Sequence, residues 1–535
     1  MRGADLLAGT LRKAGVGRIF SLSGNQIMPV YDACLEAGIA IVHTRDEGAA
    51  VFMADAWGQL TGEVGVALVT AGPGAMNAVG PLFTARASES PVLLLAGDSP
   101  RARDGQGAFQ ELAQTAVTAP LTKLSFRAGA AAGLGEDVAR ALRAALSGRP
   151  GPVHLALPAD VLEDDAGDAA LPSDRAVGAD VRAAEPGEVA AIADAIRTAE
   201  APLIVTGPAL SATRAGPLLD QLSEAADAPV VPLESPRGLR DPALGGLEHV
   251  LARADLIVSL GKTVDFGLGF GAPGVSDAAC RWIVVDAERG ERDRAHRNLG
   301  SRLAFTLDAD PRAVAEALIG QGEGGDGNGP WRAEVARRLA ARVRAGAGQG
   351  GITPAEVTAA VQRRLDAAPA SVVVCDGGEF GPWAQACVSG TERIVNGPSG
   401  AIGAGPCYAF AAGLARPDAL VVCLVGDGTA GFHLPEFETA AREGVPFVMV
   451  VGNDQRWNAE HQIQLRAFGP DRLIGCELSD ARYDLAVTAL GGHGEHVTKA
   501  GDLDGALERA IASGKPACVN VALEGQAAPG APADH

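Results

Sequence analysis

The sequence lacks long apolar runs, paired cysteines and basic clusters, and each absence argues against a class of protein. No apolar run approaches the roughly 20 residues of a membrane span, and the first fifteen residues resemble an amphipathic helix rather than a signal peptide. The eight cysteines form no CxxC pair, and Cys375 and Cys423 lie in apolar segments, which favours buried thiols in a reducing compartment. A net charge of −20 without a basic cluster argues against a nucleic-acid surface. We therefore expect a cytoplasmic protein with neither nucleic-acid nor membrane partners.

The length and the pattern of apolar residues predict an α/β protein with several domains. A chain of 535 residues is too long for one hydrophobic core and suggests about three. Short apolar runs alternate with helical patterns, as parallel sheets with covering helices require. The expected domains cover residues 1–170, 187–320 and 350–524; the expected joints and disordered tail cover 160–186, 320–330, 346–351 and 525–535.

One stretch, residues 420–457, has the pattern of a βαβ unit with acidic residues at both strand ends. A buried strand is predicted over 420–425, a helix over 429–443 and a second strand over 447–451. Asp427 follows the first strand and Asp454 follows the second. Since the carboxyl ends of parallel strands share one edge of a sheet, both carboxylates could hold one hard cation, and Mg²⁺ suits them.

This unit resembles the metal and diphosphate motif of thiamine-diphosphate (ThDP) enzymes, in which GDG is followed at this spacing by an Asn pair. Here the second Asn is replaced by Asp454, which can still ligate Mg²⁺. The resemblance implies that Asp427, Asp454 and the backbone carbonyl of Arg456 hold Mg²⁺. Glycines let a phosphate approach the backbone, and a helix N-terminus favours its charge. Diphosphate binding is thereby expected at Gly426, Gly428 and Thr429.

Further segments extend the resemblance over nearly the whole chain. They are IFSLSGNQ near the N-terminus, VGVALVTAGPGAMN at 64–77, GAFQELAQ at 107–114, GPVHLALPADV at 151–161 and NGPSGAIGAG at 396–405. Together they are similar to ThDP-dependent enzymes of the acetolactate synthase large-subunit-like family. The resemblance implies three doubly wound parallel-sheet domains: pyrimidine-binding, middle and diphosphate-binding.

In such an enzyme Glu47 would hydrogen-bond the aminopyrimidine ring and favour the tautomer that removes the C2 proton. This task needs a carboxyl group in an apolar setting that raises its pKa, and residues 49–52 (AAVF) are consistent with one. Ile402 would be the apolar wedge that bends the cofactor, although plain core packing would explain an isoleucine there equally well. The other positions that the resemblance assigns to the cofactor are Gly24, Pro73, Asn77, Gly378, Glu379 and Gly400.

The resemblance implies a carboligase or lyase acting on 2-oxo acids, with Gln110 at a polar active-site position. Glu460 lies six residues after Asp454, the spacing at which 2-oxo acid decarboxylases carry a proton-donating Glu. His461 could share that role, because it titrates near neutrality. A non-oxidative decarboxylase therefore stays an alternative. So does a 2-hydroxyacyl-CoA lyase, because GKTVDFGLGFG at 261–271 is similar to the middle segment of those enzymes.

The same family relation implies a homodimer, and commonly a homotetramer, because Glu47 and Asp427 would act across a subunit interface. The segment at 234–255 is shorter than the FAD-binding segment of true acetolactate synthases, which argues against FAD; the middle domain would then be empty or hold an adenine nucleotide. Two further classes stay open, a ThDP-binding protein used in regulation and a ThDP–flavin oxidoreductase. Retention of Glu47 and of both acidic metal ligands argues against the first.

Overall fold

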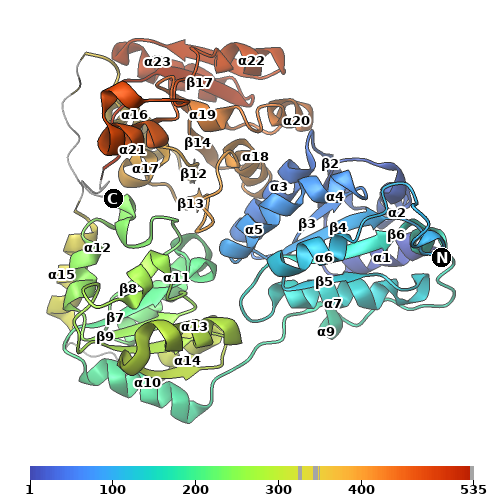
Figure 1. Cartoon of the computed structure of the whole chain (residues 1–535), viewed down its shortest axis with the longest axis horizontal. Helices are drawn as coiled ribbons and strands as arrows, with labels where there is room; N and C mark the ends of the chain where they lie inside the picture. Colours follow the sequence, from blue (N-terminus) through green and yellow to red (C-terminus); the bar gives the residue numbers. More distant parts are fainter. Residues whose placement is uncertain (323–327, 342–347, 349, 530–535) are drawn as a thin grey trace. The chain divides into compact units, whose positions relative to one another are not determined.

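The computed structural model of the protein describes residues 1–322, 328–341, 348 and 350–529. Its contacts divide the chain into two units. The first comprises Met1–Asp180, Pro406–Pro417 and His433–Val445, and the second comprises Val181–Gly405, Asp418–Phe432 and Pro446–His535. The strands form three parallel sheets, one in the first unit and two in the second (Figure 1).

The sheet of the first unit has six strands in the order β2-β1-β3-β4-β6-β5. Its central strands are apolar and fully buried, because helices cover a parallel sheet on both faces. The strands are β1 (Arg18–Ser21), β2 (Ala40–His43), β3 (Gly65–Val69), β4 (Val92–Asp98), β5 (Leu124–Arg127) and β6 (Val153–Pro158). The helices are α1 (Gly3–Lys13), α2 (Met28–Ala37), α3 (Glu47–Thr61), α4 (Pro73–Asn77), α5 (Val79–Ala87), α6 (Gln114–Thr118), α7 (Leu134–Leu146), α8 (Ala159–Glu163) and α9 (Asp174–Val177), with most of α18 (Gly405–Ala415) and α20 (Glu436–Glu443).

The middle sheet has five strands in the order β11-β10-β9-β7-β8. Neighbouring residues of β7 point to opposite faces: Ile204 belongs to one buried cluster, and Leu203 and Val205 belong to another. Both faces are therefore covered, as in a doubly wound fold. The strands are β7 (Pro202–Thr206), β8 (Val230–Pro232), β9 (Leu256–Leu260), β10 (Arg281–Val285) and β11 (Leu303–Leu307); the helices are α10 (Pro186–Thr198), α11 (Ala212–Ala225), α12 (Leu247–Arg253), α13 (Arg289–Leu299), α14 (Pro311–Gln321) and α15 (Gly329–Leu339).

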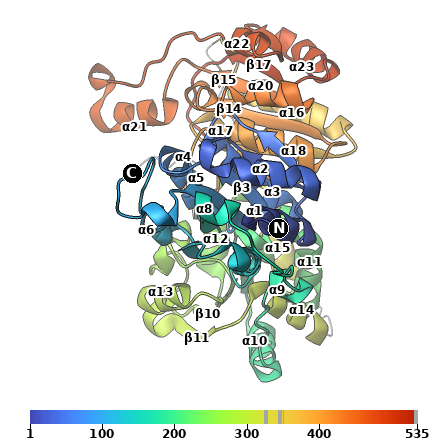
Figure 2. The same cartoon turned by 90° about the vertical axis from the view of Figure 1, so that its right-hand side faces the viewer.

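The third sheet has six strands in the order β13-β12-β14-β15-β17-β16. In Figure 2 the helix α21 stands to the side of the strands β14 and β15. The strands are β12 (Ser371–Cys375), β13 (Glu392–Val395), β14 (Leu420–Gly426), β15 (Val448–Asn453), β16 (His493–Val497) and β17 (Ala517–Ala522); the other helices are α16 (Pro354–Ala367), α17 (Phe380–Cys387), α19 (Asp427–Ala430), α21 (Asn458–Phe468), α22 (Tyr483–Ala489) and α23 (Leu503–Ala512).

The three doubly wound sheets confirm the predicted fold class, but one predicted helix is wrong. The stretch 429–443 contains two helices, α19 and α20, because Pro435 caps the second helix and the chain turns between them. Both predicted strands of the βαβ unit are confirmed, as β14 and β15. The domain boundaries stay predictions, and the expected joints at 320–330 and 346–351 and the tail lie partly outside the described residues.

Two further features of the described residues bear on the predicted character of the protein. None of the helices in the described ranges is long and apolar enough to cross a membrane. All eight cysteines are free, and seven of them are buried, as the apolar segments around Cys375 and Cys423 predicted.

Candidate functional site

Glu47 lies at the start of α3, directly after the loop that follows β2. The helix begins there because the carboxylate of Asp46 caps it, accepting a hydrogen bond from the backbone N–H of Ala49 at 3.1 Å. The side-chain amide of Asn77, at the end of α4, donates to Oε2 of Glu47 at 3.0 Å. The structure thus brings together two of the predicted cofactor residues, which lie 30 positions apart in the sequence.

The turn between β3 and α4 lets Asn77 come close to Glu47. Gly72 has a φ of +58°, a conformation that favours glycine, and Pro73 then opens α4. Gly24 packs against the same strand end, where an added Cβ would lie 2.3 Å from Cβ of Thr70. Only glycine fits this approach of the β1 loop to the end of β3. Gly24, Pro73 and Asn77 therefore surround one edge of the sheet.

Gln110 reaches this edge from a loop that is distant in sequence. An added Cβ on Gly72 would lie 3.0 Å from Cβ of Gln110. The side-chain oxygen of Gln110 accepts from Nε2 of Gln26 at 2.9 Å, and Oε1 of Gln26 accepts from the Thr70 hydroxyl at 2.6 Å. Gln26 and Thr70 were missed from sequence; their only signal is that each is a polar residue soon after a buried strand.

Asp46 is also held by a histidine from the segment 433–445 of the same unit. Nε2 of His433 lies 3.8 Å from Oδ1 of Asp46, and its ring packs edge-on against Phe52 at 5.4 Å between centroids. The interaction with His433 is the main cause that lowers the pKa of Asp46. Nearby, the buried Glu436 accepts from the backbone N–H of Arg45 at 3.0 Å. The loop before Glu47 is thus held by side chains at the start of α20 and just before it.

The second unit holds the two acidic residues of the predicted metal site. Strands β14 and β15 pair in parallel, with Gly426 opposite Gly452, so Asp427 and Asp454 follow neighbouring strand ends as predicted. Asp427 is 2% exposed. Burial raises the pKa of Asp427 to about 6; burial and then the charge of Asp427 raise the pKa of Asp454 to about 7.

The donor set fits a hard divalent cation. Asp427 is buried and Asp454 is half-buried at the same sheet edge. The two carboxylates repel each other, and a cation with oxygen ligands would remove that repulsion. The backbone N–H of Arg456 donates to Oδ2 of Asp427 at 3.2 Å, which holds the start of the following loop beside the acid. Among the described residues no group of three or more His, Cys, Asp or Glu side chains could hold a metal. Backbone carbonyl and ligand oxygens would therefore have to complete the coordination.

Gly428, directly after Asp427, is required by a close contact. An added Cβ on Gly428 would lie 2.6 Å from the ring of Trp457, so the indole closes over the turn. Gly378 has a φ of +75°, and an added Cβ there would lie 4.0 Å from Cγ2 of Thr429. The Thr429 hydroxyl donates back to the carbonyl of Gly426 at 3.0 Å. The loop after β12 and the turn after β14 therefore meet.

A buried aspartate organises the loop that carries Gly400 and Ile402. The carboxylate of Asp376, at the end of β12, accepts from the backbone N–H groups of Gly377 at 2.6 Å, Gly403 at 2.9 Å and Gly405 at 2.9 Å. Ile402 packs on Gly377, where an added Cβ would lie 2.3 Å from its Cγ2, yet it stays 38% exposed. Asp376 was missed from sequence, although an acid between a buried strand and two glycines is a usable signal.

Three predicted residues have surroundings that the sequence did not foresee. Oε1 of Glu379 accepts from the backbone N–H of Ala528 at 2.5 Å, so residues 525–529 fold back on the domain rather than leaving it as a tail. Glu460 is exposed in the first turn of α21. The adjacent His461 is buried, at 8% exposure, and burial lowers its pKa. The neighbours Glu460 and His461 thus have different environments.

A cavity of about 250 Å³ in the first unit lies at the other edge of its sheet. It is lined by residues before and at the start of β1, by the end of α3 and by α7, including Arg18, Trp57 and Leu142. Arg18 begins β1, whereas Gly24 follows its end, so this cavity is separate from the residues around Glu47.

The chain was compared with known proteins. The family model for the N-terminal TPP binding domain of thiamine pyrophosphate enzymes matches residues 1–117, and the model for the C-terminal TPP binding domain matches residues 376–521. The acetolactate synthase large subunit IlvG of Mycobacterium tuberculosis and the probable acetolactate synthase of Mycobacterium bovis are each 34% identical, over 97% of this chain and 95% of theirs. The human 2-hydroxyacyl-CoA lyase 2 is 32% identical over 92% of this chain and 84% of its own.

Proposed function

The chain belongs to the thiamine pyrophosphate-dependent enzymes of the acetolactate synthase-like family, and on that premise we propose that it is a Mg²⁺-dependent carboligase or lyase of 2-oxo acids. When bound, thiamine diphosphate supplies a nucleophilic carbon for a 2-oxo carbonyl and a sink for the electron pair released by C–C cleavage. The observation that carries the proposal is that the chain holds both required groups of residues, Glu47 with Asn77 and Asp427 with Asp454.

The proposed roles follow from the contacts. Glu47 would hydrogen-bond the pyrimidine, and the amide of Asn77 keeps its carboxylate oriented. Asp427 and Asp454, with the carbonyl of Arg456, would hold Mg²⁺ and through it the diphosphate. Gly426, which has open space beside its Cα, would admit a phosphate close to the backbone, with Gly428, Thr429 and Gly378 around it. Ile402 has the exposure that a wedge against the cofactor needs.

Cofactor binding at Gly24, Pro73, Glu379 and Gly400 stays part of the proposal. Glu379 is engaged by the backbone of Ala528, which supports a role in shaping the loop after β12. Gly400 has a φ of +68° and an open surround, so a ligand could approach its backbone.

Carboligation is favoured over simple decarboxylation by Gln110 and by the surroundings of α21. Gln110 lies beside Gly72 and contributes a neutral amide, held by Gln26, that could orient a substrate carbonyl. Glu460, the proton donor that a decarboxylase would need, is exposed. A 2-hydroxyacyl-CoA lyase is the second candidate, because such lyases are among the relatives above 30% identity. For the same family reasons we propose an assembly of at least two copies and no flavin.

The test is product analysis with purified protein, ThDP and Mg²⁺. Pyruvate should give acetolactate, detected by mass spectrometry; acetaldehyde alone would assign a decarboxylase. A panel of larger 2-oxo acids and a 2-hydroxyacyl-CoA should be run in parallel. Cleavage of the acyl-CoA without any reaction of 2-oxo acids would select the lyase, and silence on the whole panel would refute the proposal. A visible spectrum without flavin absorbance would agree with the absence of FAD.

A further inference from the structure

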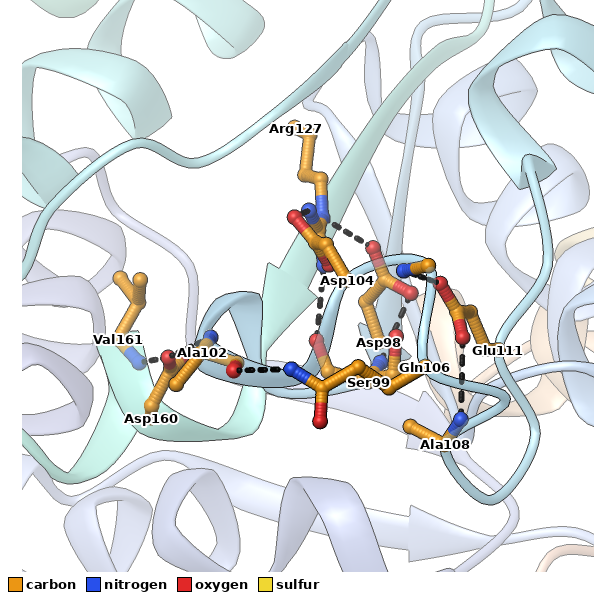
Figure 3. A network of polar contacts seen from close by, with 11 residues as sticks. Asp98, Ser99, Ala102, Asp104, Gln106, Ala108, Glu111, Arg127, Asp160 and Val161 are labelled. Atoms are coloured by element: carbon orange, nitrogen blue, oxygen red, sulfur yellow. Dashed lines mark hydrogen bonds and ion pairs between the residues drawn. The ribbon is translucent and has the colours of Figure 1, made fainter.

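The loop between β4 and α6, residues 99–113, carries Gln110 and is tied together by a network of charged side chains (Figure 3). Gln110 itself has a φ of +60°, which is uncommon for a residue with a side chain. Such a conformation persists only where the surrounding structure imposes it. The question is therefore which residues hold Gln110 in place beside Gly72.

Glu111 supplies the nearest constraint. Its carboxylate accepts from three backbone N–H groups of the same loop, those of Gly105 at 2.6 Å, Gly107 at 2.9 Å and Ala108 at 3.0 Å. Figure 3 shows the contact with Ala108. Gly105 and Gly107 both have a φ of +73°, which lets these groups converge on one side chain. These backbone hydrogen bonds, that of Gly105 foremost, lower the pKa of Glu111, so the acceptor stays ionised at neutral pH.

Arg127, on β5, fixes the beginning of the same loop to the sheet. Its guanidinium donates to Oδ2 of Asp104 at 2.7 Å and to Oδ1 at 3.0 Å, to Oδ2 of Asp98 at 2.5 Å, and to the carbonyl of Ser99 at 2.8 Å (Figure 3). Asp98 ends β4 and is 4% exposed. Position 104 is thus attached to the sheet directly, just before the residues that Glu111 binds.

The end of the loop is fixed as well. The buried Gln114 donates from Nε2 to the carbonyl of Gly97 at 2.8 Å. Between the attachments at Asp104 and Gln114, Glu111 makes the side-chain hydrogen bonds that fold residues 105–111 into their observed path. Gln110 is next to it, and its own side chain makes a hydrogen bond to Gln26.

We propose that Glu111 is a positioning residue, which acts through Gln110 by fixing the loop that holds Gln110 against Gly72 and its amide against Gln26. The inference rests on the proposed function, in which the Gly72–Pro73 turn borders the cofactor. Without the Glu111 carboxylate the three N–H groups lose their shared acceptor, and residues 105–110 relax. Gln110 then leaves the position from which it would orient the substrate carbonyl.

The test combines kinetics and a double-mutant cycle. Glu111→Ala should lower kcat/KM for the 2-oxo acid by about 10- to 100-fold, the order expected when a catalytic contact is displaced by about 1 Å. The apparent affinity for ThDP should stay unchanged. In a Gln110→Ala background the same Glu111 substitution should cause little further loss. Glu111→Gln, which keeps the shape and one acceptor oxygen, should recover part of the activity.

Multiplicative effects of the two substitutions in that cycle would overturn the proposal, because they would show that Glu111 does not act through Gln110. Glu188→Gln is a matched control, since Glu188 also accepts from a backbone N–H, that of Glu185 at 3.0 Å, but in the middle domain. It should leave the kinetics unchanged.

A readout independent of turnover separates this inference from the proposed function. Phe109 is 74% exposed, lies within the segment that Glu111 holds and is a chymotrypsin site. Glu111→Ala should speed cleavage there several-fold, and Glu188→Gln should not. Unchanged cleavage would overturn the loop-fixing role even in an active enzyme. Faster cleavage in a protein that turns over no 2-oxo acid or acyl-CoA would confirm that Glu111 fixes the loop and would refute the proposed function.

Discussion

The residues around Glu47 and those around Asp427 are held in contrasting ways. Around Glu47 the polar groups satisfy one another: Asn77 donates to Glu47, and Asp46 caps the helix. Around Asp427 the protein holds two carboxylates close together, one buried and one half-buried, whose pKa values are raised to about 6 and about 7. The first group is held by hydrogen bonds among its own residues, whereas in the second the repulsion between the two acids is only partly offset by Arg456.

This difference teaches that the two groups need their ligands for different reasons. A hydrogen-bonded carboxylate is already oriented, so the cofactor gains a prepared contact. Two like charges held close together destabilise the fold until a cation or a proton neutralises them. We therefore expect substitutions near Glu47 to affect chemistry first, and substitutions near Asp427 to affect metal binding and stability first.

The largest effect is expected for Glu47→Gln. The amide keeps an acceptor for Asn77, so the fold should remain, while proton transfer at the pyrimidine is lost. Turnover should fall by about 10²- to 10⁴-fold, the usual contribution of general acid–base catalysis, with an unchanged melting temperature. Steady-state kinetics and circular dichroism measure both. Near-normal turnover would remove Glu47 from the mechanism.

The same variant tests the proposed assembly. If Glu47 and Asp427 act across an interface, mixing Glu47→Gln with Asp427→Asn subunits should restore about a quarter of the sites, because one site of each mixed dimer is intact. A mixture as inactive as its components would place both groups of residues in the same subunit.

The second effect concerns pH and the pair Asp427–Asp454. In the folded chain without metal these carboxyls hold protons that the unfolded chain releases between about pH 4 and pH 7, since their pKa values are raised. Stability without metal should therefore fall by several kcal/mol as pH rises through this window. Thermal unfolding at pH 5 and pH 8, with and without Mg²⁺ and ThDP, measures it. Mg²⁺ with ThDP should stabilise the protein more at pH 8.

Asp454→Asn should flatten that pH dependence, because one of the two charges is gone, and it should retain Mg²⁺-dependent turnover. Asp418→Asn is the matched control at an exposed position of the same unit and should change neither quantity. A pH dependence that persists in Asp454→Asn would show that other groups cause it.

The smallest effect is expected for Asp46→Ala. Loss of the N-cap should destabilise the protein by about 1 kcal/mol, and the released start of α3 should lower turnover mildly. Asp46→Ser keeps an acceptor for the Ala49 N–H and should recover most of the stability while still losing the pair with His433. Denaturant unfolding and kinetics distinguish them. Equal losses of stability in both variants would show that the contact with His433, rather than the helix cap, is what stabilises this loop.

The sequence predicted the fold class and the neighbouring positions of Asp427 and Asp454 because both are local matters. Apolar runs of strand length indicate buried parallel strands, and the polar residue after each run lies at the edge of the sheet where ligands bind. Strands without such a run, such as β5 with its Arg127 and β16 with its two histidines, could not be recognised from the sequence. The helix predicted over 429–443 failed for a local reason too, since Pro435 starts a new helix.

By itself, then, the sequence determined which residue types stand at the strand ends, and so where a cofactor and a cation would be sought. Only the tertiary structure decided their partners. Gln26 meets Gln110 across 84 positions, and Asp376 meets Gly403 across 27, because sheet order and loop paths bring them together. The pattern of apolar and polar residues in the sequence does not predict such contacts, since they depend on the packing of the whole domain.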